Sequence, residues 1–256
     1  MLTTIRRNLC LLTLGCMAAA LAPAGAGAGE SIYERAVATA GRSAPDRERD
    51  RRERPAEVMA FAGFGPGMRI ADVFGGGGYY SELLSHVVDP GGRVLLVNNP
   101  GYASYAAEDL AARFKDGRLP EIARLVVPNA DLNLAPGTLD AALFVMAYHD
   151  LYFESAGSFP HIDAAQFLGQ LHAALKPGGL LLLVDHAAAD GSGHTLTQTL
   201  HRIDEQFAIR DLQAHGFALV KTWDGLRNPG DDRSHLVFDA VVRGQTDRFV
   251  HLYRRQ

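Results

Sequence analysis

The chain has 256 residues, and its 25 lysine and arginine side chains against 29 aspartate and glutamate side chains give a net charge of −4. An acidic balance of this kind argues against nucleic acid as a partner. Its two cysteines, Cys10 and Cys16, both lie near the N-terminus, so the rest of the chain has no thiol for a disulfide or a metal ion. The length suits one α/β domain with a full core.

The first 28 residues are typical of an export signal. Arg6 and Arg7 precede the apolar stretch 9–21, which is too short to span a bilayer comfortably. The alanine- and glycine-rich run that follows offers A-x-A cleavage sites. We predict cleavage after Ala28, and therefore an exported, periplasmic protein without a stable membrane span. Its net charge would be −6, because 23 basic side chains would remain against 29 acidic ones.

Three alternatives to simple cleavage stay open. The Arg6-Arg7 pair is a weak twin-arginine signal, which would suit a protein that folds before export. Cys16 follows a poor lipoprotein box, so a lipid anchor at this residue is the second alternative. The third is a buried N-terminal helix. After the signal (1–28), we predict a polar helical lead-in at 29–54 and one catalytic-type domain at 55–256.

The stretch from Met68 to Pro100 predicts half of a nucleotide-binding unit. Residues 68–74 form an apolar strand, four glycines follow at Gly75, Gly76, Gly77 and Gly78, residues 79–88 have helical spacing, and a second strand runs over 93–97. Only glycine lets the backbone turn this sharply and approach a ligand closely. We expect the ligand at the carboxyl end of the first strand.

The glycine spacing separates two kinds of cofactor site. A dinucleotide loop needs a third glycine at the sixth position of G-x-G-x-x-G, where this chain has Tyr80. An acid followed by alternate glycines fits better, with Asp72, Gly76 and Gly78 matching and Phe74 departing from the pattern. That pattern is typical of S-adenosylmethionine (SAM) loops; a glycine turn without a ligand is the alternative.

The remaining elements complete a Rossmann-like α/β fold. We predict a doubly wound, seven-stranded sheet, mostly parallel with an antiparallel last strand, and helices on both faces. Further strands are expected at 122–127, 141–147, 180–184, 218–222 and 237–242, and helices at 55–61, 102–114, 161–175 and 195–214.

Polar residues follow two of the buried strands. Tyr148-His149-Asp150 ends one, and Asp185-His186 ends the other, so both sets face the same cleft. A histidine there is a candidate general base, and we predict His149 and His186 as catalytic residues. Tyr148 and Asp150 are predicted to bind substrate. A purely structural histidine held by Asp150 remains the alternative for His149.

His201 and Arg202 lie beside the apolar stripe of the predicted helix 195–214, and we predict that they also bind substrate. No spacing of histidines and acids singles out a metal ion, so no metal site is predicted. Because Asp150, Asp185 and His186 end neighbouring strands, a metal-dependent catechol-type enzyme stays open.

The ordered set of motifs resembles a known family. Asp72 with its glycines and the Leu175–Gly179 turn before a strand resemble class I SAM-dependent methyltransferases. The chain is closer still to a group of exported bacterial predicted methyltransferases. That resemblance rests on residues 54–58 (RPAEV), 76–80 (GGGYY), 148–150 (YHD), 185–186 (DH), 201–204 (HRID) and 246–249 (TDRF). It implies the fold and SAM as cofactor, but it gives no established substrate.

The resemblance also assigns two cofactor-binding positions. Asn98 ends the second strand, where the family normally has a carboxylate that accepts both ribose hydroxyls. Charge-assisted hydrogen bonds are about twice as strong as neutral ones, so the amide could weaken binding by about 1–2 kcal/mol. Asp131 stands where related folds place a residue against the adenine, although a turn cap explains it equally well.

We therefore predict a SAM-dependent methyltransferase that acts on an unidentified small molecule, with a histidine base if the acceptor is a hydroxyl. The absence of an Asn-Pro-Pro-Tyr run argues against methylation of DNA bases. The main alternative is a non-catalytic exported protein that binds a small ligand on the same scaffold, and a nucleotide-using oxidoreductase is a third. SAM is made in the cytoplasm, which leaves three possibilities open: export after folding around the cofactor, a fold kept after catalysis was lost, or an N-terminal segment that is not cleaved.

Overall fold

A seven-stranded sheet crosses the computed structural model, which describes residues 30–256, so the predicted export signal lies outside the described residues. The strand order is β3-β2-β1-β4-β5-β7-β6, and only β7 runs antiparallel to its two neighbours. This confirms the predicted mixed, Rossmann-like sheet. The strands are β1 (Arg69–Val73), β2 (Arg93–Asn98), β3 (Ile122–Val126), β4 (Leu139–Val145), β5 (Leu175–His186), β6 (Phe217–Trp223) and β7 (Arg248–Arg255).

The direction of winding reverses between β1 and β4. These strands pair in parallel, with Asp72 of β1 beside Leu143 of β4 and Leu96 of β2. Both strands are buried between helices, which is why they read as continuous apolar runs. Their carboxyl ends form the switch point at which open α/β sheets bind ligands.

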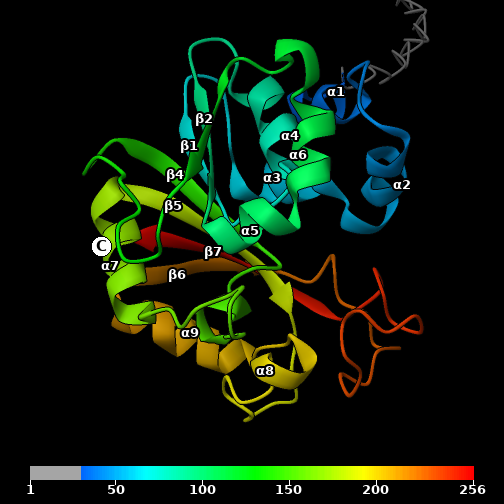
Figure 1. Ribbon diagram of the computed structural model, residues 1–256, viewed down its shortest axis with the longest axis vertical. Helices are drawn as coiled ribbons and strands as arrows, with labels where there is room; N and C mark the ends of the chain where they lie inside the picture. The colour runs from blue at the N-terminus through cyan, green and yellow to red at the C-terminus, as the bar shows by residue number, and fades with distance from the viewer. Residues whose placement is uncertain (1–29) are drawn as a thin grey trace, which may run out of the picture. The chain divides into compact units, whose positions relative to one another are not determined.

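Helices cover both faces of the sheet (Figure 1). Each face has its own apolar core. Leu168 and Leu171 of α7, with Leu212 of α9, pack on one face. Met59 of α3 and Leu83 of α4 pack on the other. The helices are α1 (Ile32–Ala38), α2 (Ala44–Glu53), α3 (Pro55–Ala62), α4 (Tyr79–Val88), α5 (Pro100–Tyr105), α6 (Ala107–Arg113), α7 (Ala164–Ala174), α8 (Thr197–Leu200) and α9 (Glu205–Ala214), with 3-10 turns η1 (Lys115–Gly117) and η2 (His149–Tyr152).

Helix α2 anchors the polar N-terminal segment to the sheet and to helix α4. Asp50 accepts hydrogen bonds from the buried Arg42 and from the Tyr79 hydroxyl, which lies just after the glycine loop. Glu53 pairs with Arg248 of β7 at 2.6 Å. Within residues 30–256, no helix has the length and apolar character needed to cross a bilayer.

The structure corrects the strand predicted at 237–242. Those residues form turns in the long loop between β6 and β7, and the last strand of the sheet is β7 instead. The position between β5 and β6 requires a segment that can be buried on both faces. Residues 248–253 meet that requirement, whereas Phe238 and Val241 are 51% and 72% exposed.

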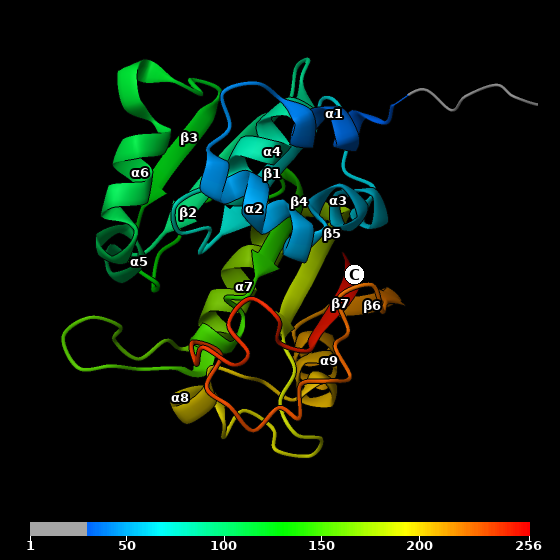
Figure 2. The same cartoon turned by 90° about the vertical axis from the view of Figure 1, so that its right-hand side faces the viewer.

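Two predicted helices are also interrupted. The helix predicted at 195–214 divides into α8 and α9, because His201 takes a left-handed conformation, Ile203 bridges to Ala187, and Asp204 caps α9. The helix predicted at 102–114 divides into α5 and α6 at Ala106. Figure 2 shows α8 beside the orange and red loop between β6 and β7.

Candidate functional site

The loop after β1 has left-handed backbone at alternate residues. Phe74, Gly76 and Gly78 have φ of 54°, 55° and 81°. These are the three glycine positions of the acid-then-alternate-glycine pattern, so the backbone follows the pattern even where the residue is phenylalanine. A bulky residue with positive φ is strained, by about 1–2 kcal/mol relative to a right-handed conformation. Tight packing around Phe74 must therefore hold it there.

Asp72 is enclosed at the end of β1. It is 2% exposed, and its Oδ2 accepts a hydrogen bond from the Ser81 hydroxyl at 2.7 Å. Burial raises the pKa of Asp72 to about 6, although the Ser81 hydrogen bonds oppose this shift. A side chain at Gly75 would start 2.4 Å from the same Oδ2, so this glycine is required by its contact with Asp72.

Asn98 binds the glycine loop itself. Its Oδ1 accepts from the Gly76 N–H at 3.0 Å, and its Nδ2 donates to the Gly76 carbonyl at 2.9 Å. The residue is buried. Arg113 of α6 donates from Nε to the Gly77 carbonyl at 2.6 Å. The loop is therefore held by this chain's own polar groups.

Phe74 packs among aromatic side chains at the end of β1. Its ring stacks on Tyr102 of α5, with centroids 4.7 Å apart and planes 7° apart, and it also contacts Phe144 of β4 and Phe167 of α7. Tyr102 in turn donates its hydroxyl to Asp150. Tyr102 thus connects the loop after β1 with the residues that follow β4.

A cavity of about 700 Å³ lies beyond Tyr102. It brings together three of the predicted residues from different elements: His149 from η2, His186 from the end of β5, and His201 after α8. Asp150 also lines it, together with Arg52 of α2 and Arg248 of β7. Its lining residues include none of Asp72, Gly75–Gly78, Asn98 and Asp131.

Asp185 fixes the position of His149. Its Oδ1 lies 2.7 Å from His149 Nδ1, and its Oδ2 accepts the His149 backbone N–H at 2.8 Å. Burial would lower the pKa of His149, but the carboxylates of Asp185 and Asp150 outweigh it and raise that pKa to about 9. The ring therefore acts as a hydrogen-bond donor to Asp185 rather than as a free base.

His186 is held differently. Its Nδ1 lies 2.7 Å from the Thr246 hydroxyl. Burial lowers the pKa of His186 well below its ordinary value, and the positive charges of His149 and Arg248 add to this effect. A neutral imidazole of this kind can accept a hydrogen bond from a ligand in the cavity, although its lowered pKa makes it a weak base.

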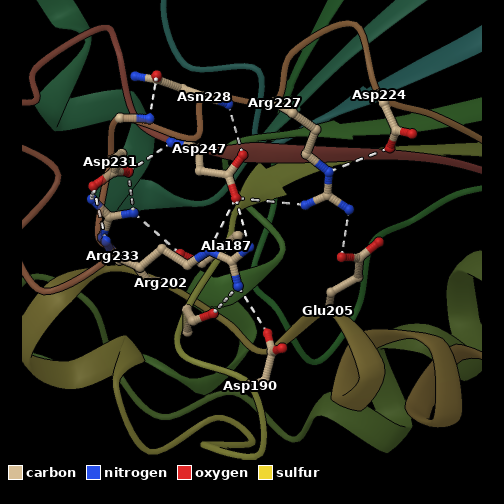
Figure 3. Close-up of polar contacts among 12 residues, drawn as sticks. Ala187, Asp190, Arg202, Glu205, Asp224, Arg227, Asn228, Asp231, Arg233 and Asp247 are labelled. Atoms are coloured by element: carbon tan, nitrogen blue, oxygen red, sulfur yellow. Dashed lines mark hydrogen bonds and ion pairs between the residues drawn. The ribbon is translucent and has the colours of Figure 1, made fainter.

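Two residues predicted to bind substrate lie outside the cavity lining. Tyr148 is fully buried and donates its hydroxyl to Asp211 of α9. Arg202 is fully buried as well, with Nη1 2.8 Å from Asp231 Oδ2, and it also donates to the carbonyl of Ala187 (Figure 3). The structure gives both residues internal partners, so direct contact with a substrate in this cavity is not supported.

Asp131 lies in a separate, exposed turn. Its Oδ1 accepts the Asn133 N–H at 2.9 Å, which is the turn cap that the sequence left open. Asp131 lines a second hollow beside Gln170 of α7.

Comparison with known proteins bears on the fold. No family model and no curated protein sequence matches the chain. A SAM-dependent methyltransferase from Aquifex aeolicus is similar in structure, with 18% identity, a TM-score of 0.55, and coverage of 78% of this chain and 88% of that one. An arsenic(III) SAM methyltransferase from Chlamydomonas reinhardtii is also similar, with 17% identity, a TM-score of 0.53, and coverage of 89% of this chain and 74% of that one. The [4+2]-cyclase SpnF has 17% identity, a TM-score of 0.52, and coverage of 85% of this chain and 84% of that one.

The chain has the class I methyltransferase fold. At these identities the likeness establishes the fold alone, and the presence of a cyclase among the similar structures shows that this fold also carries other chemistry.

The loop after β1 offers bare main chain to SAM, while two side chains beside it are engaged within the protein. The alternate positive φ values and the half-buried Gly75–Gly77 segment provide bare main chain. Asn98 is buried and engaged with Gly76, and the Phe74 ring is stacked on Tyr102. In this arrangement, called the closed loop below, a ligand that bonds to Asn98 or takes the place of the Phe74 ring must displace these contacts.

Three important residues were not predicted. Tyr102 was only part of an expected helix, although it separates Phe74 from Asp150. Asp185 was noted at a strand end but was not given the role of orienting His149. Thr246, which holds His186, lies on the loop before β7. An acid directly before His186 was the one sequence signal available for this network.

Proposed function

We propose that the chain is a SAM-dependent methyltransferase that acts on a small molecule held in the histidine-lined cavity. The observation that supports this most is the loop after β1, which adopts left-handed backbone at residues 74, 76 and 78 directly after a buried acid and at the switch point of the sheet. The fold of the similar SAM-dependent enzymes supports the same assignment.

SAM, when bound, supplies a methyl group that is already activated by the sulfonium. This chain's own residues would then have to bind and orient an acceptor. His186 can accept a hydrogen bond from an acceptor hydroxyl, because burial and its neighbours lower its pKa and keep the ring neutral, but the same shift makes it a weak base. Four arginines line the same cavity against two acids, Glu53 and Asp150, and although Arg248 is paired with Glu53, this surplus would favour an acceptor with negative charge.

Binding of SAM requires the closed loop to open. Tyr102 stacks on Phe74 on one side and bonds to Asp150 on the other, so its movement would join the loop to the cavity. We infer that Phe74 and Tyr102 move together, since their rings are nearly parallel and in contact.

Calorimetric titration of the purified full chain with SAM tests the proposal. Saturable binding is expected, and Gly76→Val should abolish it because a branched side chain is strained at a φ of +55°. Gly178→Val is the matched control: its φ is +76° and, like Gly76, it has open space where a Cβ would stand, but it lies at the start of β5. No heat with millimolar SAM, or equal loss in both variants, would rule out this loop as the SAM site.

The closed loop favours a second candidate function, a protein that binds a small ligand in the cavity without methyl transfer. In that case Phe74 and Asn98 would be permanent parts of the fold. Native mass spectrometry of protein isolated from its own compartment distinguishes the two, because a retained molecule other than SAM or S-adenosylhomocysteine would support the binding protein.

We also propose that the protein belongs to an exported group of such methyltransferases and reaches the periplasm through residues 1–28. This rests on the charged, apolar and alanine-rich pattern of that segment. Fractionation followed by N-terminal sequencing tests it. A mature N-terminus after Ala28 in the periplasmic fraction supports export, and an intact Met1 in the cytoplasm contradicts it.

A further inference from the structure

Three side-chain atoms converge at the wall of the cavity. His149 Nε2 lies 3.3 Å from His201 Nδ1 and 3.4 Å from Asp150 Oδ1, and His201 Nδ1 lies 3.6 Å from the same Oδ1. His149 and Asp150 are neighbours in η2, and His201 is the left-handed residue after α8. The fold brings them together, and no metal-binding sequence motif predicts the group. All three line the cavity.

The separations agree with one coordination geometry. A tetrahedral ion with bonds of about 2.0–2.1 Å places its ligand atoms about 3.3–3.4 Å apart. Adjacent ligands of an octahedral ion with bonds of about 2.1 Å would be only about 3.0 Å apart. The observed separations of 3.3, 3.4 and 3.6 Å between these atoms are closer to the tetrahedral value than to the octahedral one.

The neighbouring residues orient two of the three atoms. Asp185 contacts His149 Nδ1 at 2.7 Å, so when a metal ion displaces the second proton of this ring, Nδ1–H donates to Asp185 and the Nε2 lone pair is available to the ion. Tyr102 donates to Asp150 Oδ2, which leaves Oδ1 free for the same centre. A carboxylate behind a ligating histidine is the usual outer contact of a metal site. Ring contacts with Phe153 and Phe238 hold His201.

We propose that His149 Nε2, Asp150 Oδ1 and His201 Nδ1 bind one divalent transition-metal ion, zinc by their geometry, with its fourth position open to the cavity. Two imidazoles and one carboxylate suit zinc and disfavour magnesium or calcium, which prefer oxygen ligands. An open fourth position is typical of catalytic rather than structural zinc. The ion would polarise an oxygen of whatever molecule occupies the cavity.

The alternative occupant of the triangle is a proton. A protonated His149 could donate from Nε2 to Asp150 Oδ1, and the carboxylates that raise its pKa would favour that state. A second proton, on His201 Nδ1, would account for the approach of that atom to His149 Nε2 and Asp150 Oδ1, so titration with Zn²⁺ decides between protons and a metal ion. The proposal does not depend on methyl transfer, since metal binding is measured without SAM.

The test uses the full chain without a histidine tag, treated with a chelator and then titrated with Zn²⁺ alone by calorimetry. We expect one ion per chain, no comparable binding of Mg²⁺, and a visible spectrum of four-coordinate Co²⁺ when Co²⁺ replaces Zn²⁺. His201→Gln and Asp150→Asn should each weaken Zn²⁺ binding by more than 100-fold. Asp185→Asn should weaken it by about 10–100-fold, as expected for an outer contact.

His161→Gln is the matched control, because His161 is 80% exposed, faces the acid Glu154 at 3.4 Å, and is not part of the triangle. It should bind Zn²⁺ like the unmodified chain. Circular dichroism checks that each variant is folded, and the Co²⁺ spectrum of the unmodified chain gives an answer even if a variant unfolds. Absence of Zn²⁺ binding, or equal binding by His201→Gln and Asp150→Asn, would overturn the proposal.

Discussion

The side-chain amide of Asn98 binds both backbone groups of Gly76, since its Oδ1 accepts from the N–H at 3.0 Å and its Nδ2 donates to the carbonyl at 2.9 Å. An amide can make this pair of bonds, because it carries one acceptor and one donor on the same planar group. A carboxylate, which the methyltransferase resemblance leads one to expect here, has no hydrogen to donate. The departure at residue 98 therefore matches a loop that is held closed.

Asn98→Asp should open the loop toward SAM. The introduced carboxylate can accept from Gly76 N–H but repels its carbonyl, and it regains the charge that strengthens bonds to ribose hydroxyls. We expect SAM affinity to rise about tenfold and the free energy of unfolding to fall by about 1–2 kcal/mol. Calorimetry and urea unfolding measure the two effects. Asn129→Asp, which alters the amide bonded to Asn99, is the control, and unchanged affinity in Asn98→Asp would contradict this account of the loop.

Phe74→Gly should restore the full glycine pattern and empty the switch point. Removing a buried phenylalanine ring costs about 3–5 kcal/mol, and relief of the positive φ returns about 1–2 kcal/mol. We therefore expect a net loss of stability of about 1–4 kcal/mol together with tighter SAM binding. Phe167→Ala removes a ring of the same cluster without changing the loop backbone. It should lose as much stability or more and gain no affinity; equal gains in both variants would refute the role of Phe74.

The sheet could be predicted because its information is local. Buried strands such as 141–147 read as continuous apolar runs, and the glycines after Asp72 mark the first turn. The last strand was misplaced because a short apolar alternation at 237–242 resembles a strand, and only the vacant position between β5 and β6 selects residues 248–255. The segment in this position must be buried on both faces of the sheet, and a local sequence pattern does not show which segment meets that condition.

The site was predicted in its parts but not in its connections. His149, Asp150, His186 and His201 were all singled out from their places at strand ends or in a motif, and the structure brings them to one cavity. The role of Tyr102 depends on contacts with residues 28 and 48 positions away, and such contacts leave no trace in spacing. The same holds for the internal partner of Arg202, which lies on the loop between β6 and β7.

Asp72→Asn should stabilise the protein at neutral pH. Burial raises the pKa of Asp72 to about 6, so the folded state retains a proton that the unfolded state loses near pH 4. Stability is therefore lost as pH rises through this interval, and above pH 6 the cost reaches about 3 kcal/mol. We expect the asparagine variant to be more stable by up to that amount at pH 7.5 and by progressively less as the pH falls toward 4.

Asp140→Asn is the control of opposite sign. Burial would raise the pKa of Asp140, but hydrogen bonds from the Arg69 N–H and from Lys176 outweigh it and lower that pKa. Its ionised form contributes stability above its unfolded pKa, and the contribution is lost as the pH falls through the folded pKa. Asp140→Asn should therefore destabilise the protein at pH 7.5. Urea unfolding at several pH values tests both, and a destabilised Asp72→Asn at pH 7.5 would contradict the raised pKa.

Arg202 and Asp231 should act as a structural pair rather than as part of a substrate site. Both side chains are fully buried, and two guanidinium–carboxylate contacts of 2.8 and 3.1 Å join them. Removing one partner leaves a buried, unpaired charge, so Arg202→Met should cost about 3–5 kcal/mol. Arg202→Met combined with Asp231→Leu should cost less than Arg202→Met alone, because no unpaired charge remains.

Thermal and urea unfolding of the two single variants and the double variant form a complete cycle for this pair. Arg233→Met is the comparison, since Arg233 pairs with Asp190 and Asp247 at a side-chain exposure of 30% and should cost about 1 kcal/mol or less. Hydrogen exchange should also rise across residues 227–247 in Arg202→Met, because Arg202 donates to the His235 carbonyl on that loop. If Arg202→Met kept full stability and slow exchange, its predicted role as a substrate contact would become the better explanation.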